Sequence, residues 1–343
     1  MKALVLGGSV FVGRWLVELL VAEGHDVTVL NRGRTESALP GSVERLVADR
    51  TDRESMRSAL AGASWDAIFD VSGFVMAAGG SDVTDLLDLV DGSVGHYVYV
   101  SSIMAYDQSQ LGLMPWTEDM ATDTSGPRTY GGFKAMAEAA MLERCGRTRF
   151  PVSIVRPAAI YGPNNNIYDM ETPMFLRLLH HRPILLPHEG LVVGSYGHVD
   201  DLCSLMVAMV GNDRAVGEIF NVTAEAVTTR RYVDALAGIV GEPPDLRLVP
   251  LARLAELPPG VFGHLFGARH HAVLSIAKAR LLLGFEPRFD FVDGHADTYR
   301  WFCEQGWAGL DHSLADPVWR ASWDFAVEEL AAAMLAVPEV AAR

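Results

Sequence analysis

The chain begins with an apolar strand that runs directly into glycines, and this start constrains the fold more than any other feature. The first twenty residues read MKALVLGGSVFVGRWLVELL, with Gly7 and Gly8 ending the strand and Gly13 in the first turn of a helical pattern. Glycines at these positions let the backbone turn tightly, approach a pyrophosphate and pack the helix closely on the strand. The segment therefore predicts a nucleotide-binding turn.

Val10 occupies the position where such turns usually carry a middle glycine. A valine there predicts a negative φ and a slightly remodelled loop, because glycine is the residue that adopts positive φ without strain. The rest of the turn can still hold a dinucleotide. We expect it to do so through Gly7, Gly8, Ser9, Phe11, Val12 and Gly13.

The first half of the chain alternates apolar strands with amphipathic helices. Continuous apolar strands separated by such helices indicate a parallel sheet covered on both faces, which is the Rossmann-like, doubly wound class of α/β fold. The expected strands are 2–8, 26–32, 43–50, 65–73 and 96–102, and the expected helices are 12–24, 52–62 and 83–90.

The regular alternation ends after residue 163. Residues 164–198 are rich in loops and prolines, whereas 217–223 has the pattern of one more strand of the sheet. We expect no flexible linker, so the second domain grows out of the first by insertion and extension. The expected organisation is a Rossmann domain of residues 1–163, to which 195–223 return, and a smaller C-terminal α+β region of residues 164–194 and 224–343 that binds substrate.

Composition excludes several classes of protein. A net charge of −15 disfavours nucleic acids and anionic membranes as partners, because phosphate binding normally needs a basic surface. No apolar run approaches about 18 residues, and the strand at the very start leaves no room for a signal peptide.

No pattern of carboxylates or cysteines accompanies the histidine pairs at 180–181 and 270–271, so we expect no metal site. The scattered cysteines favour a reduced, cytoplasmic setting: Cys145, Cys203 and Cys303.

The ends of the second, third and fourth strands supply further candidate nucleotide contacts. Asn31 stands where a carboxylate would favour NAD, and Arg32 and Arg34 can pair with a 2′-phosphate. We therefore expect NADP to be favoured over NAD. Asp49 can accept a hydrogen bond from the adenine amino group, although capping of the next helix is a rival role for the same stretch. The other expected contacts are Arg50, Val71, Ser72 and Gly73.

Tyr130 and Lys134 are the candidate catalytic pair. They lie four residues apart on one predicted helix face, after a strand that ends at Ser102 on the carboxyl edge of the sheet. A phenol with a pKa of about 10 is a poor base at neutral pH, but a nearby ammonium and a positive nicotinamide lower that pKa. Lowering it by three units takes about 4 kcal/mol. Tyr130 could then exchange a proton with a substrate oxygen that Ser102 holds, while Lys134 anchors the nicotinamide ribose.

With these motifs the chain resembles the extended short-chain dehydrogenase/reductase family, also called the NAD-dependent epimerase/dehydratase family. The resemblance runs from residue 1 to about 300 and rests on GGSVFVG, VSS before AY, YGGFK, RPAAIYGP and HVDDL. It implies a Rossmann domain, a smaller substrate domain and a homodimer formed through the tyrosine-bearing helix. It also implies that residues 156–163, including Pro157 and Ile160, pass near the nicotinamide, and that His198 to Asp201 tie the two domains together.

GGSVFVGR further resembles a branch of this family written GGTxFxGR, which includes plastid RNA-associated proteins. Two departures from the family pattern narrow the activity. Ile103 and Met104 stand where 4,6-dehydratases have an acidic pair, so such a dehydration is not expected. Gly194 stands where many nucleotide-sugar enzymes have an arginine that grips the diphosphate. Candidate replacements for that arginine are Arg177, Arg182 and Arg269.

Several functions remain open at this stage. The first is an NAD(P)-dependent oxidoreductase or epimerase that transfers hydride at a secondary alcohol or ketone of a sugar-like or cyclitol-like molecule. A second is an NADPH-dependent ketoreductase of a non-sugar natural-product intermediate. A third is a non-catalytic NAD(P)- or RNA-binding protein, and a fourth is a redox sensor that regulates a partner. The expected partner is a small polyhydroxylated or carbonyl substrate, with neither nucleic acid nor membrane involved.

Overall fold

The computed structural model describes residues 1–34, 38–72, 81–109, 114–165, 170–258, 261–262, 270–310 and 325–336, without the side chains of 81 and 82. The chain divides into two compact units. Unit 1 comprises Met1–Ile160, Gly197–Thr223 and Leu274–Arg288, and unit 2 comprises Tyr161–Tyr196, Ala224–Val273 and Phe289–Arg343.

Unit 1 is built on a seven-stranded sheet in the order β10-β6-β5-β4-β1-β2-β3. Every pairing in it is parallel, and the order reverses at β1, as the doubly wound class requires. The predicted Rossmann-like fold is therefore confirmed. The strands are β1 (Lys2–Leu6), β2 (Asp26–Asn31), β3 (Glu44–Val47), β4 (Trp65–Asp70), β5 (Val94–Val100), β6 (Val152–Pro157) and β10 (Ile219–Val222).

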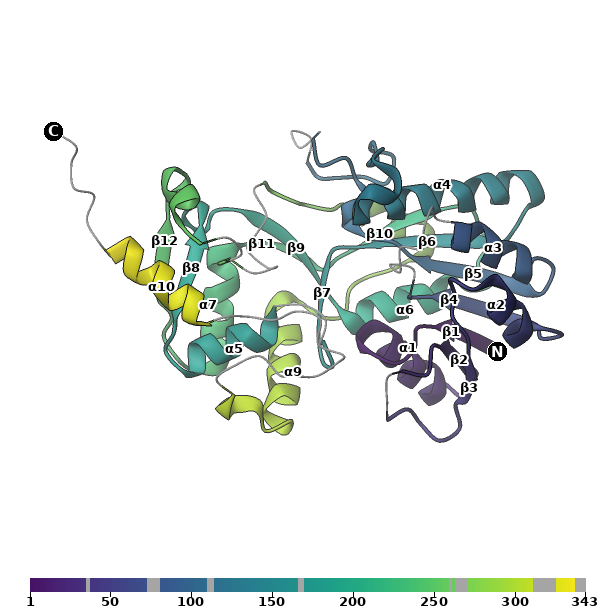
Figure 1. Ribbon diagram of the computed structural model, residues 1–343, viewed down its shortest axis with the longest axis horizontal. Coiled ribbons are helices and arrows are strands. Elements are labelled where there is room, and N and C mark those ends of the chain that lie inside the picture. The colour runs from purple at the N-terminus through teal and green to yellow at the C-terminus, as the bar shows by residue number, and fades with distance from the viewer. Residues whose placement is uncertain are drawn as a thin grey trace. The chain divides into compact units, whose positions relative to one another are not determined.

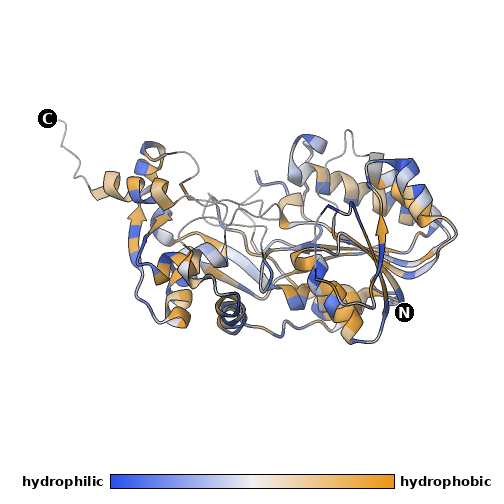
Figure 2. Ribbon diagram, turned by 60° about the horizontal axis from the view of Figure 1, so that its bottom comes forward, coloured by the Kyte–Doolittle hydropathy of each residue, from blue (hydrophilic) through white to orange (hydrophobic). Residues whose placement is uncertain are grey.

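Helices cover both faces of this sheet (Figure 1). Contacts join α1 to α6 on one side, and join α2 to α3 and α3 to α4 on the other. The central strands are buried and coloured hydrophobic along most of their length (Figure 2), because a sheet covered twice leaves no face for water. The helices are α1 (Phe11–Ala22), α2 (Arg53–Leu60), α3 (Ser81–Val90), α4 (Tyr130–Thr148) and α6 (Val199–Met209).

Residues 274–288 belong to unit 1, although the sequence assigned them to the C-terminal region. They carry α8 (Ala277–Leu283), which packs against β10. The Asn221 side chain of β10 donates to the carbonyl of Ser275 at 3.2 Å, and Lys278 pairs with Glu218. These contacts join segments more than fifty residues apart, which local sequence patterns do not report.

The described part of unit 2 contains four α-helices and two pairs of strands. β8 (Pro183–Pro187) pairs in parallel with β12 (Asp245–Val249), and β11 (Glu225–Thr228) pairs antiparallel with β9 (Val193–His198). The α-helices are α5 (Glu171–Leu179), α7 (Thr229–Val240), α9 (Phe291–Glu304) and α10 (Phe325–Ala336). The remaining strand, β7 (Ala159–Tyr161), contains the boundary between the two units. Among the described helices of both units, none has the length and apolarity needed to cross a membrane.

Candidate cofactor and active site

The glycine turn between β1 and α1 is as tight as the sequence predicts. Gly7 has φ of 94°, and an added Cβ there would lie 2.7 Å from the Cβ of Ser72. An added Cβ at Gly13 would lie 3.0 Å from the carbonyl carbon of Gly7 and closer still to its oxygen. Val10 has φ of −139°, so the predicted negative φ is confirmed, and Phe11 takes the positive value of 39° instead.

The start of α1 fits a phosphate group. No side chain caps this helix, and its first turn contains no acidic residue. An uncapped helix N-terminus offers backbone N–H groups and a partial positive charge to an anion. Gly8 leaves no space for a side chain either, since an added Cβ would lie 2.8 Å from Val29 and 2.9 Å from Val17. The turn can therefore hold a pyrophosphate against its backbone.

Asn31 and Ser9 lie together at the carboxyl end of β2. The Asn31 amide donates to Ser9 Oγ at 2.7 Å, and Asn31 Oδ1 accepts from the Gly33 N–H at 2.8 Å. Asn31 thus ties the loop after β2 to the glycine turn. Arg32 and Arg34 follow it on this loop and are exposed.

The stretch after β3 separates two roles that the sequence left open. Asp52 caps α2, because its side chain accepts from the N–H groups of Glu54 and Ser55 at 3.0 and 3.1 Å. Asp49 instead accepts from the N–H and hydroxyl of Thr51. These bonds, with weaker contributions from nearby arginines, lower the pKa of Asp49. Helix capping therefore falls to Asp52.

Arg50 binds a buried carboxylate that the sequence analysis did not single out. Its guanidinium contacts both oxygens of Asp70, at 2.8 and 3.1 Å, and donates to Ser72 Oγ at 2.8 Å. The Tyr97 hydroxyl donates to the same carboxylate at 2.8 Å. Burial alone would raise the pKa of Asp70, but Arg50 and the Tyr97 hydrogen bond outweigh it and lower that pKa. Val71 continues from β4 toward Ser72, and Gly73 lies outside the described residues.

Ser102 and Tyr130 each lie at the start of a helical segment. Ser102 Oγ accepts from the N–H of Met104 and caps the short 3₁₀ helix Ile103–Ala105. Thr129 Oγ1 accepts from the N–H of Gly132 at 3.0 Å, so α4 begins at Tyr130. Ser102 therefore lies just after the carboxyl end of β5. Tyr130 begins α4, whose Lys134 contacts the last residue of β5.

The side chain of Lys134 lies beside the ring of Tyr130, its predicted catalytic partner. It is 1% exposed, and its Nζ donates to the Val100 carbonyl at 2.6 Å. Nζ lies 4.7 Å from the ring centroid of Tyr99 and 5.7 Å from that of Tyr130. Burial lowers the pKa of Lys134 to about 7, against a smaller raising effect from Asp70. The amine therefore lies beside the phenol ring, and its pKa lies near neutral pH.

Gly131 and Gly132 allow close packing within the protein. An added Cβ at Gly131 would lie 3.0 Å from the Met104 carbonyl carbon, and one at Gly132 would meet Ser125 and Gly126. The start of α4 therefore presses directly on the segments that follow β5. This packing places the start of α4, where Tyr130 lies, against the 3₁₀ helix that Ser102 caps.

The family motifs in β6 and α6 have structural partners in unit 1. Arg156 binds Glu138 through Nε and Nη2, at 3.0 and 2.6 Å, so this arginine joins β6 to α4. Pro157 ends β6, and Ile160 ends the first segment of unit 1. His198 caps α6, and Asp200 accepts from the indole of Trp15 at 3.1 Å. The helix start expected for HVDDL is found, while its role between domains stays a prediction.

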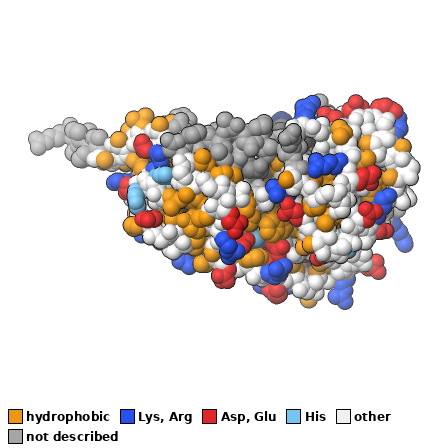
Figure 3. All heavy atoms as spheres, turned by 90° about the horizontal axis from the view of Figure 1, so that it is seen from below, with side chains coloured by type: hydrophobic (Ala, Val, Ile, Leu, Met, Phe, Trp, Pro, Cys, Tyr) orange, Lys and Arg blue, Asp and Glu red, His pale blue; other side chains and the backbone are white. Residues whose placement is uncertain are grey.

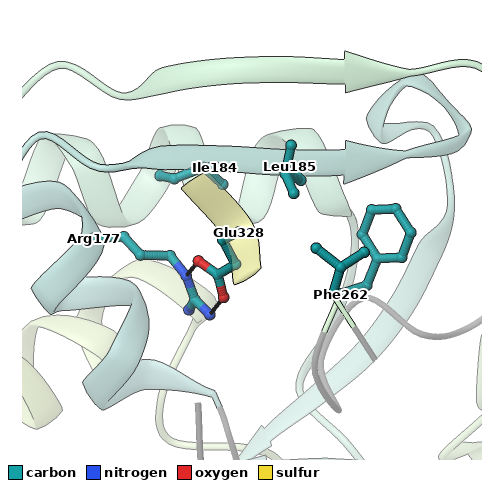
Figure 4. Close-up of a pocket in the computed structure, with 6 residues that line it drawn as sticks. Arg177, Ile184, Leu185, Phe262 and Glu328 are labelled. Carbon is teal, nitrogen blue, oxygen red and sulfur yellow. Dashed lines mark hydrogen bonds and ion pairs between the residues drawn. The ribbon is translucent and has the colours of Figure 1, made fainter. Parts of the chain in front are cut away.

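Two of the three candidate arginine clamps are held by α10. Arg177 binds both oxygens of Glu328, at 2.8 and 2.5 Å, and lines a small pocket with Phe262 (Figure 4). Arg182 binds Glu329 at 2.6 Å and covers the ring of Phe325. Arg269 lies outside the described residues.

Charges of both signs are mixed on the face seen in Figure 3. Over the described atoms of this face, blue and red side chains alternate without a continuous basic patch. Nucleic acid binding usually relies on such a patch. Within the described residues, no group of three or more histidine, cysteine or acidic side chains could hold a metal ion.

Comparisons with known proteins agree with this geometry. The model of the NAD dependent epimerase/dehydratase family matches residues 3–223. The chain is 30% identical to the chloroplast stem-loop binding protein of 41 kDa b from Arabidopsis thaliana, over 87% of this chain and 78% of that protein. It is 26% identical to UDP-glucose 4-epimerase from Mycolicibacterium smegmatis, over 88% and 98%. The solved UDP-glucose 4-epimerase of Thermotoga maritima superimposes with a TM-score of 0.75 at 20% identity, over 89% and 99%.

Proposed function

Because this chain belongs to the NAD dependent epimerase/dehydratase family, we propose that unit 1 binds NAD(P) and that the protein transfers hydride at a secondary alcohol or ketone. The observation that carries the proposal is the position of Lys134 beside Tyr130. Its Nζ lies 5.7 Å from the phenol ring, at the carboxyl edge where doubly wound sheets bind ligands. A charged amine next to a phenol lowers the pKa of the phenol, which supports proton exchange with an alcohol.

The residues present fit a dinucleotide. The uncapped start of α1 would receive the pyrophosphate, and the loop that Asn31 ties to Ser9 would border the adenosine. Arg32 and Arg34 would pair with a 2′-phosphate, which favours NADP. When bound, the nicotinamide supplies or accepts the hydride.

Three side chains of this chain would handle the substrate and its proton. Tyr130 would exchange a proton between its phenol oxygen and the substrate oxygen, and Ser102 would hold that oxygen. Lys134, when charged, favours the phenolate by electrostatic attraction and can donate to a ribose hydroxyl. In a family member of this kind, proton and hydride leave the same carbinol together.

We propose a sugar-like or cyclitol-like substrate that carries no nucleotide. Unit 2 contains 18 acidic residues, ten arginines and no lysine. Of the seven arginines in its described part, six form ion pairs with carboxylates, and Arg177 is buried in one of them. Arginines that bind a nucleoside diphosphate would have to exchange these carboxylates for phosphate oxygens, whereas a neutral or amine-bearing polyol needs no such exchange. A non-sugar natural-product ketone is the alternative.

Tyr130→Phe tests the assignment of the base. This variant should lose turnover while its affinity for NADPH changes less than twofold, because the hydroxyl handles the substrate proton and not the dinucleotide. Activity is followed by absorbance at 340 nm with a panel of carbonyl compounds, and affinity by NADPH fluorescence. Normal turnover in Tyr130→Phe would refute the role.

The requirement for added cofactor distinguishes the two reaction types. An epimerase returns the hydride to the other face of the same molecule, so it turns over without added NAD(P)H. A reductase consumes the cofactor stoichiometrically.

We also propose that the protein is cytoplasmic and forms a homodimer through α4. Light scattering on the purified protein tests whether it is a dimer.

RNA binding is a second candidate, favoured by the similarity to the Arabidopsis stem-loop binding protein. The net charge of −15 and the mixed charges on the described atoms of the face in Figure 3 oppose it. A gel-shift titration with a stem-loop RNA at low salt tests whether the protein binds RNA. No shift at micromolar protein removes this candidate, whereas a salt-sensitive shift supports it.

A further inference from the structure

We propose that Asp70 is a positioning residue that favours the ammonium form of Lys134, with Arg50 and Tyr97 holding the carboxylate in place. The meaning of this for catalysis rests on the proposed function. The charge relation itself does not, because it concerns groups of the folded protein alone.

Asp70 and Lys134 lie on the same face of the sheet. Asp70 is the register partner of Tyr99 on the neighbouring strand β5, and it accepts from Tyr97, two residues before Tyr99 on the same face. Lys134 Nζ lies over the Tyr99 ring and donates to the carbonyl of the next residue, Val100. The carboxylate and the amine thus flank the same tyrosine.

Neither group has access to bulk water. Asp70 is 0% exposed and Lys134 is 1% exposed. A buried amine loses its proton unless an anion or several acceptors compensate for lost hydration. The Val100 carbonyl is one such acceptor, and the aromatic faces of Tyr99 and Tyr130 add a weaker attraction. A full negative charge on the next strand supplies what these neutral groups do not.

Other charges near Lys134 are already engaged. Glu138 lies one turn along α4 and binds Arg156 through both oxygens. Arg50 repels the ammonium, but it is also the group that keeps Asp70 ionised. Burial is the largest influence on the pKa of Lys134, and Asp70 follows as the largest opposing one, ahead of Arg50 and Glu138. The net effect of the Asp70–Arg50 pair is therefore to raise the pKa of Lys134, because Asp70 raises it by more than Arg50 lowers it.

The chain permits a direct measurement, because Lys134 is one of only three lysines, with Lys2 and Lys278. Protein labelled with lysine that carries ¹³C at Cε gives three signals, which Lys2→Arg and Lys278→Arg assign. Titration of the Lys134 signal reports its pKa without any need for substrate or cofactor. In the wild type the midpoint is expected at about 7.

Asp70→Asn keeps the shape of the side chain and removes its charge. The Lys134 midpoint should fall by at least about one pH unit, the size of effect expected from a nearby buried charge. Asp66→Asn is the matched control, since Asp66 is exposed at the other end of β4, where it accepts from the Lys2 N–H. That variant should leave the Lys134 midpoint unchanged.

Asp70→Asn leaves Arg50 buried without its partner, which can prevent folding. The double variant Asp70→Asn/Arg50→Met removes both charges, and it too should lower the Lys134 midpoint, because Asp70 has the larger effect. An unchanged or raised midpoint in a folded variant would overturn the proposal. A lowered midpoint in a protein that binds neither NAD nor NADP would leave the proposal standing and refute the proposed function.

Discussion

Gly13→Ala is the substitution that separates a nucleotide-binding turn most sharply from an ordinary helix start. The added Cβ would lie 3.0 Å from the Gly7 carbonyl carbon and from the Gly8 Cα, and closer to the Gly7 oxygen. All three are backbone atoms, so no side-chain rotation relieves the overlap. Either α1 or the turn must shift.

Gly146 provides the matched control and sets the magnitude. It lies in α4, and an added Cβ there meets nothing described within 4 Å. Replacing a helical glycine by alanine stabilises by about 1 kcal/mol, which Gly146→Ala should show. Gly13→Ala has the same propensity gain but also an overpacking cost of about 1–3 kcal/mol. Its free energy of unfolding should therefore lie about 1–3 kcal/mol below that of the control.

The cofactor should report the same shift more strongly. Misalignment of one N–H from a phosphate oxygen removes a hydrogen bond to a charged group, worth about 1.5–3 kcal/mol. This corresponds to about 10- to 100-fold weaker binding. Urea unfolding followed by circular dichroism measures stability, and NADPH fluorescence measures affinity. If Gly13→Ala matched Gly146→Ala in both, the turn would not be a nucleotide site.

Three other predictions address charge. Arg32→Ala should weaken NADPH at least tenfold more than NADH in parallel titrations, and equal losses would remove the preference for NADP. Burial lowers the pKa of His96 from 6.5 to about 4, so neutral His96 contributes stability above pH 6.5 that is lost as pH falls toward 4. The stability advantage of wild type over His96→Gln should thus shrink by about 3 kcal/mol across that range, and a constant difference would contradict it. Burial raises the pKa of Glu171 to about 7, so wild type should lose stability relative to Glu171→Gln between pH 4.5 and 7, and a gain would refute this.

The parts of the site that depend on neighbours in sequence could be predicted. The turn from Gly7 to Gly13 and the spacing of Tyr130 and Lys134 need only the geometry of one strand and one helix. The glycines of the turn lie within seven residues of one another, and Tyr130 and Lys134 lie four residues apart on one helix. Such motifs keep their local shape in any sheet of this class.

The parts that depend on burial could not. The sequence analysis expects Arg50 to contact the nucleotide and gives no sign that its guanidinium binds Asp70, twenty residues later at the end of β4. Arg177 and Arg182 look available for an anion until α10, about 150 residues later, supplies Glu328 and Glu329. Charge pairs of this kind form only when distant elements pack together. The hydrophobic periodicity of the sequence does not predict them.

The central claim is that this fold holds a nicotinamide dinucleotide at the carboxyl edge of its sheet. The most direct test is calorimetric titration of NADP⁺ and NAD⁺ into protein stripped of bound nucleotide. One saturable site per chain, tighter for NADP⁺ and weakened at least tenfold in Gly13→Ala, is the predicted result. Absence of saturable binding of either dinucleotide to the folded protein would contradict the account.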